Sequence, residues 1–171
     1  MGGVGILGER TVILVDTNVI IEAVRTGCWN ALRGHYMVVT VGKCREEAQS
    51  GIPGTRGYVR VEEHDLDTRL DVVAVTESDR AQLAAGCPDV GILDAGERDL
   101  WAHALSRGDD WRAVSADQAA VRIAMLLDWG DRLVSLEELL KGAGIRPRVP
   151  LKGHYTKARL ESWRTKFRLE M

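Results

Sequence analysis

Acidic side chains in this sequence gather at two kinds of place: the end of a short apolar run, and the helix expected to follow it. A carboxylate at the end of a buried strand costs free energy unless it is hydrogen-bonded, paired or bound to a cation. Carboxylates that converge cannot all stay ionised without such a cation. The acidic residues that fit this description are Asp16, Glu46, Glu47, Asp94, Glu97 and Asp117.

The chemistry open to such a group is metal-dependent. Carboxylates are hard oxygen ligands, which select Mg²⁺ or Mn²⁺. A cation of this kind binds phosphate oxygens, activates water and stabilises the leaving group of an in-line displacement. The sequence therefore favours hydrolysis of phosphate esters as the reaction class.

Each acid also has an ordinary structural explanation. Asp16 and Asp117 are good N-caps for the helices expected after them. The acidic pair at 46–47 fits a solvated helix face. Asp94 and Glu97 are three residues apart and share one side of a first helical turn, where the helix macrodipole favours acids. The functional interpretation requires that all four groups of acids lie at one edge of a sheet. These groups are Asp16, the pair at 46–47, Asp94 with Glu97, and Asp117.

Short apolar runs alternate with segments of helical pattern along the chain. The runs predict strands at 11–15, 36–41, 72–75, 113–115 and 132–134. Helices are predicted at 17–26, 42–50, 77–85, 95–106, 117–129 and 136–141, with capping boxes at Thr76–Asp79 and Ser135–Glu138. This alternation implies an α/β fold in three α/β/α layers with a central parallel sheet. Ligands bind beyond the carboxyl ends of such strands, which is where the acids are expected.

The segments that carry these acids resemble the motifs of PIN-domain ribonucleases, the fold of the VapC-type toxins of toxin–antitoxin pairs. They are Val-Ile-Leu-Val-Asp16-Thr-Asn18, Lys43-Cys-Arg-Glu-Glu47-Ala, Leu93-Asp-Ala-Gly-Glu97-Arg and Val114-Ser-Ala-Asp117. The closing Leu133-Val-Ser-Leu-Glu-Glu-Leu-Leu140 resembles the last strand and helix of a PIN subgroup that carries an Asp-x-Gly-Glu motif. The likeness covers about residues 11–141 and lies in the order and spacing of the motifs.

The resemblance implies an endoribonuclease, a hydrolase that cuts RNA phosphodiesters with one or two Mg²⁺ or Mn²⁺ ions. By position, it implies the catalytic acids Asp16, Glu47, Glu97 and Asp117, with Asp94 as a further metal ligand and Glu46 as the alternative to Glu47. Asn18 and Ser115 match small polar residues that orient the carboxylates. A cognate antitoxin covering the acidic cleft and a homodimer are implied in the same way.

Composition narrows the class of protein. The chain has 171 residues, 45% hydrophobic and 28% charged, which is typical of one globular domain. No apolar run approaches the roughly 20 residues of a membrane span, and the start of the chain lacks the pattern of a signal peptide. Three widely spaced cysteines are expected to be reduced and buried, as in a cytoplasmic protein. The glycine motif from Gly3 to Gly8 precedes the first strand, so it does not fit a dinucleotide site.

Charge divides the chain. Residues 1–140 hold 14 Lys/Arg against 23 Asp/Glu, whereas residues 141–171 hold 9 against 2. We divide the chain into a flexible leader (1–10), a PIN-like catalytic domain (11–150) and a basic amphipathic C-terminal helix (151–171). The apolar stripe of that helix either docks on the domain or a second subunit, or its basic residues contact RNA. The candidate RNA contacts are Lys157, Arg159, Arg164, Lys166 and Arg168.

Two other functions remain open. One is a catalytically silent PIN-like scaffold that binds RNA or a protein partner. The other is a phosphatase of the haloacid-dehalogenase type with Asp16 as nucleophile. That class expects a second acid two residues later, where this chain has Asn18.

Overall fold

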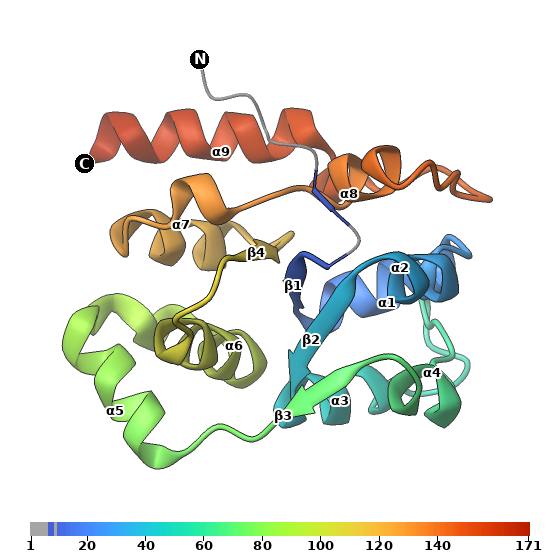
Figure 1. Ribbon diagram of the computed structural model, residues 1–171, viewed down its shortest axis with the longest axis horizontal. Coiled ribbons are helices and arrows are strands. Elements are labelled where there is room, and N and C mark those ends of the chain that lie inside the picture. The colour runs from blue at the N-terminus through green and yellow to red at the C-terminus, as the bar shows by residue number, and fades with distance from the viewer. Residues whose placement is uncertain (1–6, 9) are drawn as a thin grey trace.

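The computed structural model describes residues 7, 8 and 10–171. Four strands form one parallel sheet in the order β3-β2-β1-β4 (Figure 1). They are β1 (Val12–Val15), β2 (Met37–Val41), β3 (Asp71–Val73) and β4 (Trp111–Val114). The central β1 pairs with both β2 and β4, so that Ile13 lies opposite Val38 and Arg112. Residues 1–6 and 9 of the predicted leader, and most of its glycine motif, lie outside the described residues.

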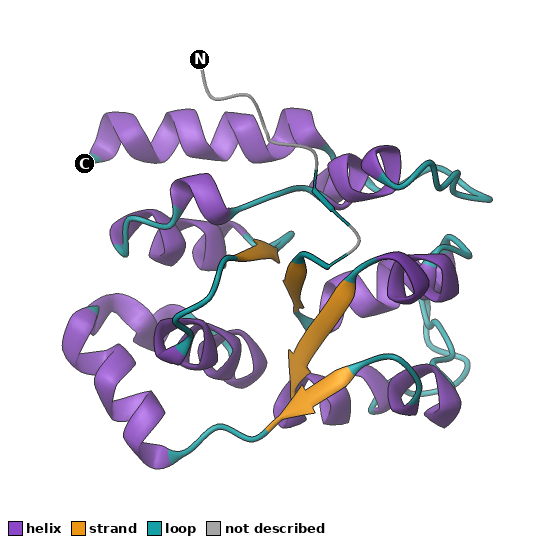
Figure 2. Cartoon of the chain, viewed as in Figure 1, coloured by secondary structure: helices purple, strands orange, loops and turns teal. Residues whose placement is uncertain are grey.

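Helices cover both faces of the sheet, as the coloured cartoon shows (Figure 2). One face packs against α1 (Thr17–Arg25), α2 (Trp29–His35), α4 (Glu63–Asp67) and α8 (Leu136–Gly142). The other packs against α5 (Glu77–Gly86), α6 (Ala95–Ser106), α7 (Gln118–Leu126) and α9 (Lys157–Glu170). α3 (Gly42–Gln49) contacts both α1 and α6. The predicted three-layer α/β/α fold is confirmed.

β1 is buried on both faces, as its unbroken apolar run predicts. Val12 and Leu14 belong to the core under α5, α6 and α7, whereas Ile13 and Val15 belong to the core under α1, α2 and α8. This alternation follows from the two-residue period of a strand. Burial of β1 fixes the position of the residue that follows it, Asp16.

The C-terminal helix is part of the core. Leu160, Trp163 and Phe167 are buried against α7, so the prediction that the apolar stripe docks on the domain is confirmed. The helix begins at Lys157 instead of residue 151, because Gly153–Tyr155 forms the short 3₁₀ helix η3 first.

The predicted strand at 132–134 is wrong. Only one bridge forms there, between Leu133 and Ala113, because Gly130–Arg132 makes the 3₁₀ turn η2 and Ser135 already caps α8. Helices α2 and α4 were not predicted. Both capping boxes, at Thr76 and Ser135, are present.

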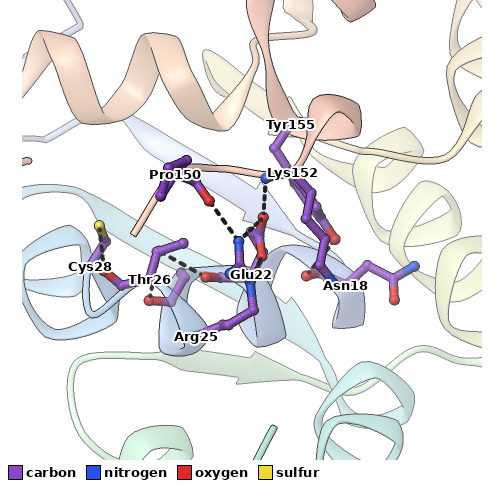
Figure 3. Close-up of polar contacts among 9 residues, drawn as sticks. Asn18, Glu22, Arg25, Thr26, Cys28, Pro150, Lys152 and Tyr155 are labelled. Atoms are coloured by element: carbon purple, nitrogen blue, oxygen red, sulfur yellow. Dashed lines mark hydrogen bonds and ion pairs between the residues drawn. The ribbon is translucent and has the colours of Figure 1, made fainter. Parts of the chain in front are cut away.

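The segment between α8 and α9 is fastened to α1 by buried polar contacts (Figure 3). Glu22 is 1% exposed, pairs with Arg25 and accepts a hydrogen bond from the Lys152 backbone N–H at 2.8 Å. The Tyr155 hydroxyl donates to the Asn18 carbonyl at 3.1 Å. These contacts hold the start of α1, and therefore Asp16, against the C-terminal part of the chain.

In the part of the chain described, no helix combines the length and apolar character that crossing a membrane requires. The three cysteines are free and buried, as predicted.

Candidate active site

Asp16 lies at the carboxyl end of β1 and is 2% exposed. Its Oδ1 accepts a hydrogen bond from the Val19 backbone N–H at 2.9 Å, so it does cap α1. Burial raises the pKa of Asp16 to about 7, and the charges of Asp94 and Asp117 add to that rise, against hydrogen bonds from Val19 and Ser115 that lower it. Capping explains the position of Oδ1, whereas Oδ2 accepts a hydrogen bond from the Ser115 hydroxyl.

Asp117 follows β4, the neighbour of β1 in the sheet. Its Oδ1 accepts from the Ala120 backbone N–H at 3.0 Å and caps α7. Ser115 links this acid to Asp16: its hydroxyl donates to Asp16 Oδ2 at 3.4 Å and accepts from the Asp117 backbone N–H at 3.3 Å. The adjacent ends of two parallel strands thus place Asp16 and Asp117 at one edge, where Ser115 forms a hydrogen bond with each of them.

Asp94 and Glu97 come from the first turn of α6. Asp94 caps the helix by accepting from the Glu97 backbone N–H at 2.9 Å. The Glu97 side chain is buried, and its residue is 7% exposed. Burial raises the pKa of Glu97 to about 8, and the charges of Asp117, Asp94 and Asp16 add to the rise in that order. The charges of Asp94 and Asp117 contribute to the raised pKa of both Asp16 and Glu97, so these four carboxylates from three segments lie at the same edge of the sheet; we call them the acidic cluster.

Glu47 stands beside this cluster and is held by the residue after Asp16. The Thr17 hydroxyl donates to Glu47 Oε2 at 2.9 Å. The same oxygen lies close to α6, since a Cβ added at Gly96 would come within 2.5 Å of it. Glu46 is exposed on the same helix and lies 3.5 Å from Lys43. The structure therefore brings Glu47, and not Glu46, to the edge of the cluster.

Thr17 and Gly96 also shape the site, although neither was among the residues expected from the sequence. A glycine in the first turn of a helix, where it lowers stability relative to alanine, is the signal that a close approach occurs there. Here the approaching group is the Glu47 carboxylate. Thr17 gave no signal of its own, because a threonine after a helix cap is ordinary.

Other predicted residues make no side-chain hydrogen bond or ion pair with the cluster in the described part of the chain. Asn18 is exposed, and its backbone carbonyl accepts a hydrogen bond from the Tyr155 hydroxyl. Arg164 donates to the Leu133 carbonyl and to Glu161, so its guanidinium is engaged within the fold. The remaining basic candidates of the C-terminal helix are exposed on α9: Lys157, Arg159, Lys166 and Arg168.

The acidic cluster suits a hard divalent cation in its chemistry. Four carboxylates supply only oxygen donors, and burial, with added contributions from the neighbouring carboxylates, raises the pKa of Asp16 and of Glu97. The side chains do not form a closed coordination shell: among the residues described, no three acidic, histidine or cysteine side chains stand where they would together hold a metal ion.

The chain matches no protein-family model, no curated protein and no solved structure.

Proposed function

We propose that the protein is a metal-dependent endoribonuclease of the PIN type, which hydrolyses RNA phosphodiesters at the acidic cluster. The observation that carries this proposal is the convergence of four carboxylates from three segments, two of them buried with pKa values near neutrality. Buried acids without a fixed cationic partner are costly. Strongly perturbed acids are also a common feature of functional sites.

The chain's own residues have distinct roles in this proposal. Asp16, Asp94, Glu97 and Asp117 would hold one or two Mg²⁺ or Mn²⁺ ions, and Glu47 would complete the set from the side of α3. Such an ion supplies Lewis-acid stabilisation of the phosphate and an activated water. Ser115 fixes the relative orientation of Asp16 and Asp117 through its two hydrogen bonds.

We further propose, on the PIN resemblance, that the protein is the toxin of a type II toxin–antitoxin pair and acts in the cytoplasm as a homodimer. A cognate antitoxin would then cover the acidic cluster. Induced expression should arrest growth of a bacterial host, and an Asp117→Asn variant expressed to the same level should not. Equal arrest by the two proteins would contradict the toxin proposal.

Cleavage of a mixed RNA pool by the purified protein tests the nuclease proposal. The reactions contain Mn²⁺, Mg²⁺ or EDTA, with the variants Asp117→Asn and Asp131→Asn beside the wild type. Asp131 is an exposed acid outside the cluster, so its variant is a matched control. We expect metal-dependent cleavage by the wild type and the control, and none by Asp117→Asn. Cleavage that survives in Asp117→Asn would refute the assignment.

A binding scaffold is the second candidate, favoured by the absence of a closed metal shell among the described residues and by the exposed basic residues of α9. Truncating α9 would remove buried core residues and is not a clean test. The charge-reversal variant Lys166→Glu/Arg168→Glu is cleaner, because both side chains are exposed. A scaffold should lose RNA binding in this variant and show no metal-dependent cleavage in any form.

A further inference from the structure

A surface groove lies next to the acidic cluster, between α3, α5, α6 and the 3₁₀ turn η1 (Pro88–Ile92). Its volume is about 630 Å³, within the range of roughly 300–1,000 Å³ that is usual for small-ligand sites. Ala95 and Arg98 of α6 line it, and Asp94, a member of the acidic cluster, directly precedes Ala95. The groove is therefore linked to the cluster through the first turn of α6 (Figure 1 shows α3, α5 and α6).

Two cationic side chains in this groove are available to an anion. Arg80 is committed, because Asp99 accepts two hydrogen bonds from its guanidinium, at 2.8 and 2.9 Å. Lys43 has only an exposed contact with Glu46 at 3.5 Å, and exposed pairs of this kind are weak and easily exchanged. Arg98 forms no ion pair with any acid in the described part of the chain. Lys43 and Arg98 are thus the more weakly engaged basic side chains of the groove, whereas its two acids, Glu77 and Asp99, both pair with Arg80.

The groove is also lined by small apolar side chains, which we call its apolar floor. Ala81 and Ala84 of α5 and Pro88 and Val90 of η1 line it. Such a floor accepts the flat face of a base or ribose without leaving a buried polar group unsatisfied. A phosphate beside an apolar, flat group is the composition of a nucleotide.

We propose that the groove binds one nucleotide of a single-stranded RNA, with its phosphate at Lys43 and Arg98 and its base or ribose on the apolar floor. The position of this subsite beside the cleaved bond rests on the proposed function. Binding of the RNA itself does not, since it needs only the groove. The charges of Lys43 and Arg98 would also offset the repulsion that the acidic cluster exerts on an approaching RNA backbone.

The test measures the affinity of a short fluorescein-labelled single-stranded RNA by anisotropy, in EDTA, over a series of salt concentrations. The variant is Lys43→Ala/Arg98→Ala, and the control is Lys141→Ala/Arg146→Ala, which removes the same two residue types from exposed positions in and after α8. We expect the groove variant to bind about tenfold more weakly and to reduce the salt slope by about one, with little change in the control.

A charge-keeping variant, Lys43→Arg/Arg98→Lys, should restore most of the binding, and circular dichroism checks that each variant is folded. Unchanged affinity of the alanine variant, an equal loss in both alanine variants, or a wild type that does not bind RNA would each overturn the subsite.

Cleavage of the same RNA with Mn²⁺ separates the two proposals. If the wild type cleaves and the groove variant cleaves with the same KM, the nuclease stands and the subsite is wrong. If the wild type does not cleave but binding is lost only in the groove variant, the subsite stands and the nuclease is wrong.

Discussion

Replacing Asp16 by asparagine should stabilise the metal-free protein while abolishing its proposed activity. The pKa of Asp16 rises from 3.8 to about 7 on folding, mainly through burial. The folded protein therefore holds a proton that the unfolded chain releases above pH 4. By linkage, the stability that this proton confers is complete below pH 4 and is lost as the pH rises to about 7.

The size of the effect follows from the shift. About three pKa units correspond to on the order of 4 kcal/mol, at about 1.4 kcal/mol a unit. Asparagine has no charge to bury, keeps the oxygen that accepts from Val19, and caps helices as well as aspartate. The Asp16→Asn protein should thus be more stable than the wild type by about 4 kcal/mol at pH 8. At pH 5 the difference should fall to between about 1 and 2 kcal/mol.

Urea unfolding followed by circular dichroism, in EDTA at pH 5 and pH 8, measures this difference. Asp131→Asn is the control and should leave the free energy of unfolding within about 0.5 kcal/mol of the wild type. A variant no more stable than the wild type at pH 8, or a difference that does not change with pH, would refute the reasoning. Either result would mean that Asp16 is solvated or paired in the folded protein.

Three further predictions concern the cation, Glu47 and the C-terminal helix. Mn²⁺ should raise the melting temperature of the wild type more at pH 8 than at pH 5, because it binds ionised carboxylates. It should raise the melting temperature of Asp16→Asn only slightly. An equal rise in the wild type and in Asp16→Asn would contradict this. Glu47→Gln should reduce RNA cleavage by about 10- to 100-fold. Gly96→Ala should have a similar effect, because the added Cβ would displace the Glu47 carboxylate. Glu46→Gln is the control, and an equal loss of cleavage in it would refute the assignment of Glu47 to the site. Trp163→Ala should lower the free energy of unfolding, measured by urea denaturation, by about 3–5 kcal/mol, because Trp163 is buried against the domain. A decrease below about 1 kcal/mol would contradict the packing of α9.

The sheet and the position of the acids could be predicted because local patterns determine them. A continuous apolar run identifies β1, and the parallel arrangement puts Asp16 and Asp117 at one edge whatever the details of the loops. The capping boxes at Thr76 and Ser135 fixed the start of two helices in the same local way.

Features that depend on contacts distant in sequence could not be predicted. The choice of Glu47 over Glu46 is made by Thr17, thirty residues away, and by the space that Gly96 leaves. Helix α2 is short, and its burial comes from contacts with other segments such as the hydrogen bond from Trp29 to the Asp65 carbonyl. The strand expected at 132–134 has an apolar pattern, but the turns on either side leave room for a single bridge.

The central claim is that the acidic cluster is a nuclease site. Its most direct test is to replace three members of the cluster one at a time and measure whether each replacement abolishes cleavage. The measurement is the rate of cleavage of one defined RNA in Mn²⁺ by the wild type, Asp16→Asn, Glu97→Gln, Asp117→Asn and the control Asp131→Asn. We predict that the three cluster variants are inactive and folded, that the control cleaves like the wild type, and that EDTA stops both active proteins. Cleavage by any two of the cluster variants at the wild-type rate would contradict a nuclease site at these carboxylates.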